Sequence, residues 1–133
     1  MAQAILNDSL IPLSNESLAS LPSHIKRPLY DRSALTAGIV HIGLGNFHRA
    51  HQAWYLHRLM QSGQALDWAI IGAGVRSYDQ AQREKLASQD YHTTLIELDP
   101  KGRSAEVCGS MIDYIPIPDG NAPLIARMAQ ADI

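Results

Sequence analysis

Short apolar runs alternate with amphipathic stretches from residue 38 onward. Residues 38–42 (Gly-Ile-Val-His-Ile) and 68–72 (Trp-Ala-Ile-Ile-Gly) are almost entirely apolar, which is typical of strands buried in a parallel sheet. Between them, from Phe47 or His48 to about Gln61, apolar residues recur three and four positions apart, which predicts a helix with one buried stripe. The stripe comprises Ala53, Leu56, Leu59 and Met60.

The pattern continues with a second helix and a hairpin. We expect a polar helix over residues 79–88, a strand over 91–98, a turn at 100–102 and a hairpin partner over 105–112. Residues 114–120 are expected to be extended and then to break, and residues 123–131 to form a helix with proline at its start. A strand–helix–strand order implies parallel pairing through a right-handed crossover.

Residues 1–37 lack this periodicity. Pro12, Pro22 and Pro28 interrupt any long helix, so we expect an N-terminal arm that packs on the domain surface. Residues 38–133 then form an α/β unit, the N-terminal part of a Rossmann-type doubly wound domain. Because such a domain normally has two βαβαβ halves, the sequence predicts a truncated fold, a partial NAD-binding domain.

Gly43 and Gly45 lie where the first strand should turn into the first helix. Gly43 can adopt backbone angles that a side chain would forbid, and Gly45 allows a pyrophosphate to approach the backbone. The helix N-terminus then offers free N–H groups to the anion, and Asn46 adds a side-chain donor. The usual third glycine is replaced by His48, so the helix must pack differently, with Ala50 and Ala53 as candidate small surfaces. The other interpretation is a structural tight turn.

An acidic residue near the end of the second strand commonly binds the adenosine ribose. The strand tip here has none, and the first acid downstream is Asp79, preceded by Arg76. Asp79 would accept hydrogen bonds from the ribose hydroxyls and favour NAD, whereas Arg76 would pair with a 2′-phosphate and favour NADP. Alternatively, Asp79 only caps the second helix. The spacing does not separate these possibilities.

Composition removes several classes of function. The formal net charge is −2 and the basic residues are scattered, so we expect no nucleic-acid partner. No segment is long and apolar enough for a membrane span, and residues 1–21 lack the basic region of a signal peptide. The single cysteine, Cys108, is expected to be a buried apolar residue in a reducing, cytoplasmic setting. The histidines show no zincin spacing, and we expect no metal site.

The run from Gly38 to Ala53 contains Gly-Leu-Gly-Asn-Phe-His-Arg-Ala-His. It resembles the mannitol dehydrogenase family of polyol-specific long-chain dehydrogenases, whose signature in this turn also has histidine in place of the third glycine. The similarity continues through residues 66–68, 72–77 and 89–91, and covers about residues 38–112. The resemblance implies a set of cofactor-binding residues: Ile42, Gly43, Leu44, Gly45, Asn46, Phe47, His48, Arg49, Arg76 and Asp79.

The resemblance also implies chemistry and further parts of the protein. Asp79 matches the aspartate of NAD-preferring members, although Tyr78 stands where an acid often precedes it. Family members oxidise a polyol to a ketose without zinc, using a lysine base in a helical C-terminal substrate domain. We therefore expect no catalytic residue and no activity in this chain alone, a polyol or ketose as substrate, and a C-terminal substrate domain as its partner.

The loop Gly-Ala-Gly-Val-Arg after the second strand is similar to the branch that interconverts D-mannitol and D-fructose. A fructuronate or tagaturonate reductase, or another polyol dehydrogenase, is the nearest alternative. A non-catalytic nucleotide-binding module is the alternative from a different functional class.

Overall fold

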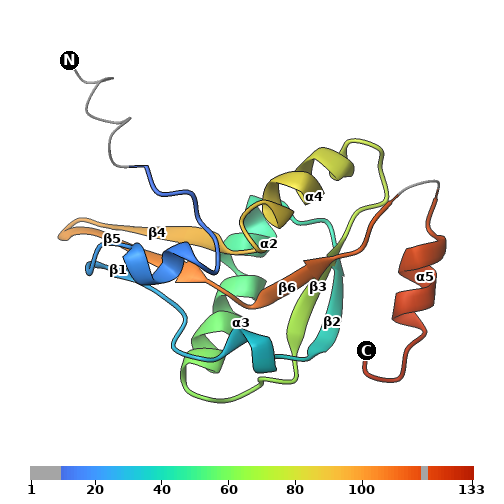
Figure 1. Cartoon of the computed structure of the whole chain (residues 1–133), viewed down its shortest axis with the longest axis horizontal. Coiled ribbons are helices and arrows are strands. Elements are labelled where there is room, and N and C mark those ends of the chain that lie inside the picture. Colours follow the sequence, from blue (N-terminus) through green and yellow to red (C-terminus); the bar gives the residue numbers. More distant parts are fainter. Residues whose placement is uncertain (1–9, 118–119) are drawn as a thin grey trace.

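A three-stranded parallel sheet forms the centre of the molecule. We describe a computed structural model over residues 10–117 and 120–133. The strands are β2 (Ala37–Ile42), β3 (Ala69–Ala73) and β6 (Met111–Tyr114), hydrogen-bonded in the order β2-β3-β6. Both pairs are parallel, so the predicted strand–helix–strand crossover is confirmed (Figure 1).

Helices cover both faces of this sheet. Helices α2 (Asn46–Ala50), α3 (Gln52–Gln61) and α4 (Asp79–Ala87) follow the first two strands, and α5 (Ala122–Met128) follows the third. Ile70 packs with residues of α3 and α4, whereas the next residue, Ile71, packs with Leu124 of α5. Because successive strand side chains point to opposite faces, α5 lies across the sheet from the other helices, as Figure 1 shows.

The single helix predicted up to Gln61 is wrong. The backbone breaks at His51 (φ −121°, ψ −85°), which separates α2 from α3. The predicted stripe also needs correction, since Leu59 is 42% exposed while His57 is fully buried. His57 is tolerated in the interior because it has hydrogen-bond partners that the helical periodicity does not reveal.

The hairpin comprises β4 (Thr93–Asp99) and β5 (Gly102–Cys108), paired antiparallel. The predicted partner over 105–112 wrongly merged two strands, because the chain leaves the hairpin at Gly109 and Ser110 and joins the parallel sheet as β6. The Ser110 hydroxyl donates to the Ala53 carbonyl at 2.7 Å. A Cβ on Gly109 would lie 2.9 Å from Arg32 and Pro28, so the crossing needs glycine. The extended segment predicted over residues 114–120, and its break, lie partly outside the described residues, at 118–119.

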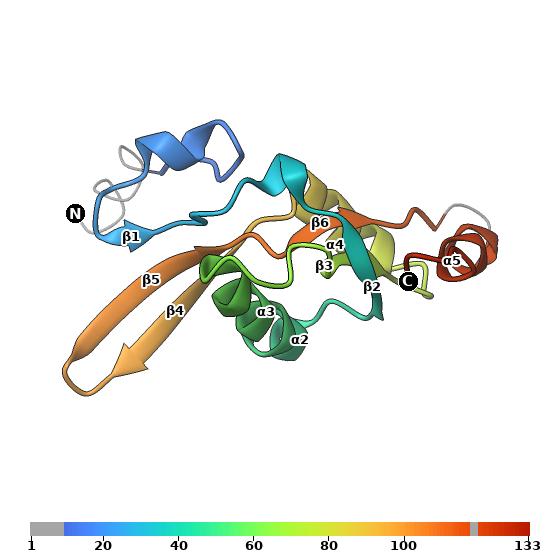
Figure 2. The ribbon, with the colours of Figure 1, turned by 90° about the horizontal axis from the view of Figure 1, so that it is seen from below.

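The N-terminal arm is more than a surface layer. It contains η1 (Ser17–Ser20), β1 (Ile25–Lys26) and η2 (Arg32–Ala34), and β1 adds a parallel strand to β5. Figure 2 shows β1 beside the hairpin, which extends away from the parallel sheet. The Arg32 guanidinium donates to the carbonyls of Asp90, Gly109 and Met111, so it links the arm to the point where the chain changes sheet.

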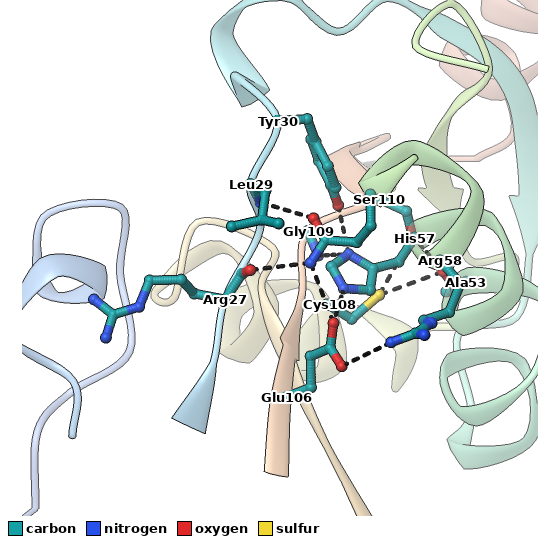
Figure 3. Close-up of polar contacts among 11 residues, drawn as sticks. Arg27, Leu29, Tyr30, Ala53, His57, Arg58, Glu106, Cys108, Gly109 and Ser110 are labelled. Carbon is teal, nitrogen blue, oxygen red and sulfur yellow. Dashed lines mark hydrogen bonds and ion pairs between the residues drawn. The ribbon is translucent and has the colours of Figure 1, made fainter. Parts of the chain in front are cut away.

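A buried polar network also attaches the arm (Figure 3). The backbone N–H of Gly109 donates to His57 Nδ1 at 3.4 Å, and the Tyr30 hydroxyl lies 2.7 Å from the same atom. A backbone N–H can only donate, so Nδ1 is the acceptor and Nε2 carries the proton. Nε2 then donates to Glu106 Oε1 at 3.0 Å. Burial lowers the pKa of His57 despite Glu106, so the ring is neutral and the carboxylate charged at neutral pH.

The Glu106 carboxylate has two further donors. Gln61 Nε2 lies 3.2 Å from Oε1, and Arg58 lies 3.3 Å from Oε2. Burial alone would raise the pKa of Glu106, but the hydrogen bonds from His57 and Gln61 outweigh it and lower the pKa. The network therefore joins the arm, α3 and β5 at neutral pH, where His57 is neutral and Glu106 is ionised.

No helix in the described part of the chain has the length and apolar character to cross a bilayer.

Candidate nucleotide site

The glycine turn lies at the carboxyl end of β2. Gly43 has φ +94°, which L side chains rarely adopt, and its N–H donates to the Ala73 carbonyl at 2.8 Å. Gly45 precedes α2 in an ordinary extended conformation (φ −70°, ψ 178°). A Cβ added to either residue would meet no protein atom within 4 Å. The backbone explains the glycine at position 43, whereas glycine at position 45 leaves open space beside the helix N-terminus.

Leu44 attaches this turn to the neighbouring strand. Its side chain is 3% exposed and belongs to the core between the sheet and α3. It occupies the space over Gly72 of β3, where an added Cβ would lie 2.2 Å from Leu44 Cδ1 and 3.0 Å from Tyr114. The close approach of the turn to β3 therefore depends on a glycine in the strand, not only on those in the turn.

His48 takes the place of the third glycine by stacking. Its ring lies 3.7 Å from that of His41 in β2, with 16° between the planes, and Nδ1 is 3.0 Å from Gln52 Oε1. Burial and the neighbouring His41 lower the pKa of His48 to about 4, so the stacked ring is neutral at pH 7. The helix packs on β2 through this ring pair, while Ala53 supplies the fully buried small surface that was expected.

Asp79 closes the loop between β3 and α4. Its Oδ2 accepts hydrogen bonds from the backbone N–H groups of Val75 and Arg76, both at 3.0 Å. The helix-cap interpretation is wrong, because these donors belong to the preceding loop and α4 has no side-chain cap. A Cβ on Gly74 would lie 2.3 Å from the Asp79 Cβ, so this loop also requires glycine.

The turn and the loop face one pocket of about 590 Å³. Of the residues predicted to bind the cofactor, the structure brings six together here. They are Ile42, Gly43, Leu44, Gly45, Arg76 and Asp79. The remaining lining residues are Val75, Tyr78, Ala81, Gln82, Lys85 and Tyr114.

Four predicted residues lie outside this pocket. Phe47 is 79% exposed and stacks on His51 at 4.2 Å. Arg49 donates to Asn46 Oδ1, and both residues line a separate hollow against β4. His48 is buried in its stack. A cofactor role for these four stays a prediction.

Sequence reasoning missed the six other lining residues, Gln82, Lys85 and Tyr114 among them. Gln82 lies three positions after Asp79 and Lys85 three after Gln82, so i, i+3 spacing could have indicated that neighbouring members of this row adjoin. No local signal identifies Tyr114, which reaches the pocket from β6 because of the sheet order. Among the described residues, no group of three or more His, Cys, Asp or Glu side chains is arranged to hold a metal ion.

The arrangement suits an anionic ligand with a sugar. Parallel α/β sheets bind ligands outside the carboxyl ends of their strands, and here the ends of β2 and β3 contribute the turn and the loop. Arg76 and Lys85 supply positive charge beside one carboxylate, that of Asp79. An open glycine turn on one side, and on the other a carboxylate that can accept from a hydroxyl with two cations beside it, suit a phosphate joined to a ribose.

Comparison with known proteins agrees with this geometry. Residues 37–133 match the family model described as the mannitol dehydrogenase Rossmann domain. The chain is 55% identical to mannitol 2-dehydrogenase of Cereibacter sphaeroides over 109 residues, which is 82% of this chain and 23% of that protein. It is 49% identical to mannitol 2-dehydrogenase of Neosartorya fischeri, covering 81% of this chain and 22% of that protein.

Solved structures show the same similarity. Mannitol 2-dehydrogenase of Pseudomonas fluorescens, in a ternary complex with NAD and D-mannitol, superimposes with a TM-score of 0.88 at 42% identity. That match covers 92% of this chain and 25% of that one. A D-sorbitol dehydrogenase in substrate-free form gives a TM-score of 0.68 at 36% identity, over 77% of this chain and 21% of that one.

The chain therefore spans about a quarter of the length of the relatives that it matches. The matched quarter contains the parallel sheet, the glycine turn and the loop of Asp79. These residues form a Rossmann-type α/β fold, and the chain belongs to the mannitol dehydrogenase family.

Proposed function

We propose that this chain is the NAD-binding part of an NAD-dependent polyol dehydrogenase that interconverts D-mannitol and D-fructose. One observation carries the proposal: the glycine turn and Asp79 line one pocket at the ends of two adjacent parallel strands. The relative with 42% identity over nearly the whole chain was solved with NAD and D-mannitol, which supports the cofactor and the substrate.

The pocket residues fit a dinucleotide. A volume of about 590 Å³ is within the usual range for cofactor sites. The open space beside Gly43 and Gly45 admits a pyrophosphate. Asp79 uses Oδ2 for the loop, and within the described residues no hydrogen bond engages Oδ1, which remains to accept from a ribose hydroxyl. Asp79 thus favours NAD over NADP in this proposal.

When bound, the nicotinamide accepts or returns the hydride. This chain's residues would orient the cofactor: Gly45 admits the pyrophosphate, the start of α2 offers N–H groups to it, and Asp79 fixes the adenosine ribose. Proton transfer needs an acid–base group near the alcohol. We propose that this group is a lysine in a helical substrate domain outside this chain, and that the chain alone does not turn over mannitol.

Gly45 gives a direct test of the cofactor site. Gly45→Ala and Gly45→Val should leave the denaturation midpoint unchanged, because the backbone is extended and the added Cβ meets no protein atom. NAD affinity, measured by isothermal titration calorimetry, should fall progressively with side-chain size. A wild-type chain that fails to bind NAD, or an alanine variant that binds it equally well, would contradict the proposal.

The substrate is tested on a protein of the relatives' length that carries this sequence. We expect NADH formation with D-mannitol and oxidation of NADH with D-fructose. Reduction of fructuronate or tagaturonate, with no NADH signal from mannitol, would reject the mannitol assignment and favour a hexuronate reductase of the same family. NAD binding without turnover of any of these substrates would favour a non-catalytic module.

A further inference from the structure

Tyr78 and Arg76 form a pair at the rim of the nucleotide pocket. The Arg76 guanidinium carbon lies 5.5 Å from the centre of the Tyr78 ring, and its NH1 group donates to the Tyr78 hydroxyl. Both residues line the pocket together with the glycine turn and Asp79. A cation above an aromatic face is attractive, so the two side chains support each other's orientation.

The loop that carries this pair is held in place. Asp79 accepts the N–H groups of Val75 and Arg76, and Gly74 allows the Asp79 side chain to pack against the backbone. Tyr78 directly precedes Asp79 in the chain. The pair is therefore positioned by the same contacts that position the proposed ribose acceptor.

Tyr78 has no evident packing role. Its side chain belongs to none of the apolar clusters of the described residues, and the residue is 63% exposed. An aromatic residue that is exposed yet oriented by a neighbour is a suitable surface for a flat ligand group. Nucleobases stack well on aromatic rings and on guanidinium planes.

We propose that Tyr78 and Arg76 form the adenine-binding platform of this site, a role that rests on the proposed NAD binding. A ribose at Asp79 carries its base at the adjoining sugar carbon, so the base lies within reach of the neighbouring Tyr78 ring. Arg76 contributes through its position on that ring. Since the contacts with Tyr78 hold the Arg76 guanidinium on the ring, we assign Arg76 to the base platform and not to a 2′-phosphate receptor.

The experiment compares Tyr78→Ala, Tyr78→Phe and a control, Tyr55→Ala. Tyr55 is exposed to a similar extent, 65%, but lies on α3 outside the pocket. Calorimetry with NAD, ADP-ribose and nicotinamide mononucleotide separates the two halves of the cofactor. Tyr78→Ala should weaken NAD and ADP-ribose by roughly 5- to 150-fold, the usual effect of removing one base–aromatic stack. Tyr78→Phe, which keeps the ring, should lose much less.

The outcomes are distinguishable from failure of the proposed function. If the wild-type chain binds no NAD, the proposed function fails. If it binds NAD but Tyr78→Ala does so equally well, or weakens nicotinamide mononucleotide to the same degree, the platform is wrong. A loss with Tyr55→Ala as large as that with Tyr78→Ala would also reject it.

Arg76→Ala tests the second half of the inference. We expect its NAD affinity to fall and its ratio of NAD to NADP affinity to stay near that of the wild type. A selective loss of NADP binding would show that Arg76 receives a 2′-phosphate, and would overturn the assignment of Arg76 to the platform.

Discussion

Glu106→Ala should destabilise the chain strongly, although Glu106 lies outside the nucleotide pocket. The Glu106 side chain is 7% exposed and faces His57, Gln61 and Arg58 at 3.0, 3.2 and 3.3 Å. Truncation removes all three acceptor contacts and leaves the His57 Nε2–H group buried without a partner. The loss of unfolding free energy is therefore that of breaking a buried, charged hydrogen-bond network.

The three contacts contribute unequally. His57 is fully buried, so its orphaned N–H costs about 1–3 kcal/mol. The loss of the Glu106 Cγ methylene from the interior adds about 1 kcal/mol. Arg58 contributes little, because its side chain is 55% exposed and regains water. Gln61 keeps its bond to the Arg27 carbonyl. The total loss of unfolding free energy is about 3 kcal/mol.

Urea denaturation of the chain measures this loss. Trp54 provides a local probe, since its ring is stacked 5.4 Å from that of His57. Glu106→Gln keeps an oxygen that can accept from His57 and should lose roughly 1 kcal/mol, while Arg58→Ala should lose less than about 1 kcal/mol. If Glu106→Ala were no less stable than Arg58→Ala, the network would not hold the arm as described.

Three further predictions concern the histidines and the glycines. His48 and His92 are buried with pKa values of about 4, below the usual unfolded value of about 6.5. The folded state therefore binds fewer protons than the unfolded state, and the free energy of unfolding falls as pH drops from 6.5 towards 4. At pH 5 the loss is roughly 2 kcal/mol per histidine. An equal urea midpoint at pH 7 and pH 5 would refute this. Gly72→Ala should lower the free energy of unfolding by about 1–3 kcal/mol and weaken NAD binding, because the added Cβ displaces Leu44. Unchanged NAD affinity in calorimetry would show that the position of the glycine turn does not depend on the packing of Leu44 over Gly72. Gly43→Ala should cost about 1–2 kcal/mol through its φ of +94° alone, and denaturation showing no loss would exclude the left-handed backbone.

Local patterns were sufficient to predict most elements near the site. The strand before Gly43, the turn and the crossover to a second parallel strand are all present. Apolar runs and glycines act within a few residues, so their consequences can be derived from neighbouring positions. The same reasoning identified Asp79 but not the role of its carboxylate in closing the loop, because the donors, Val75 and Arg76, are backbone groups without a sequence signature.

Long-range contacts decided the remainder. His57 lies four positions after Ala53 and three before Met60, on the buried stripe of α3. Its polar ring can stay buried there because of Tyr30 and Glu106, 27 and 49 residues away. The exit of the chain from the hairpin at Gly109 depends on packing against Arg32 of the arm. These contacts join segments that are far apart along the chain, so no periodic pattern in the sequence reveals them.

The glycine turn shows most clearly which features follow from the sequence and which depend on the tertiary structure. The sequence by itself determined that a strand must turn sharply at Gly43 and that Gly45 leaves its backbone open, because both follow from the missing Cβ. Only the tertiary structure decided how His48 could replace a glycine, since the stacking partner His41 is brought to it by the fold. It also decided which residues share the pocket, because Tyr114 arrives there through the strand order β2-β3-β6. Side-chain chemistry is a local property, whereas the walls of a site are set by how the strands are ordered.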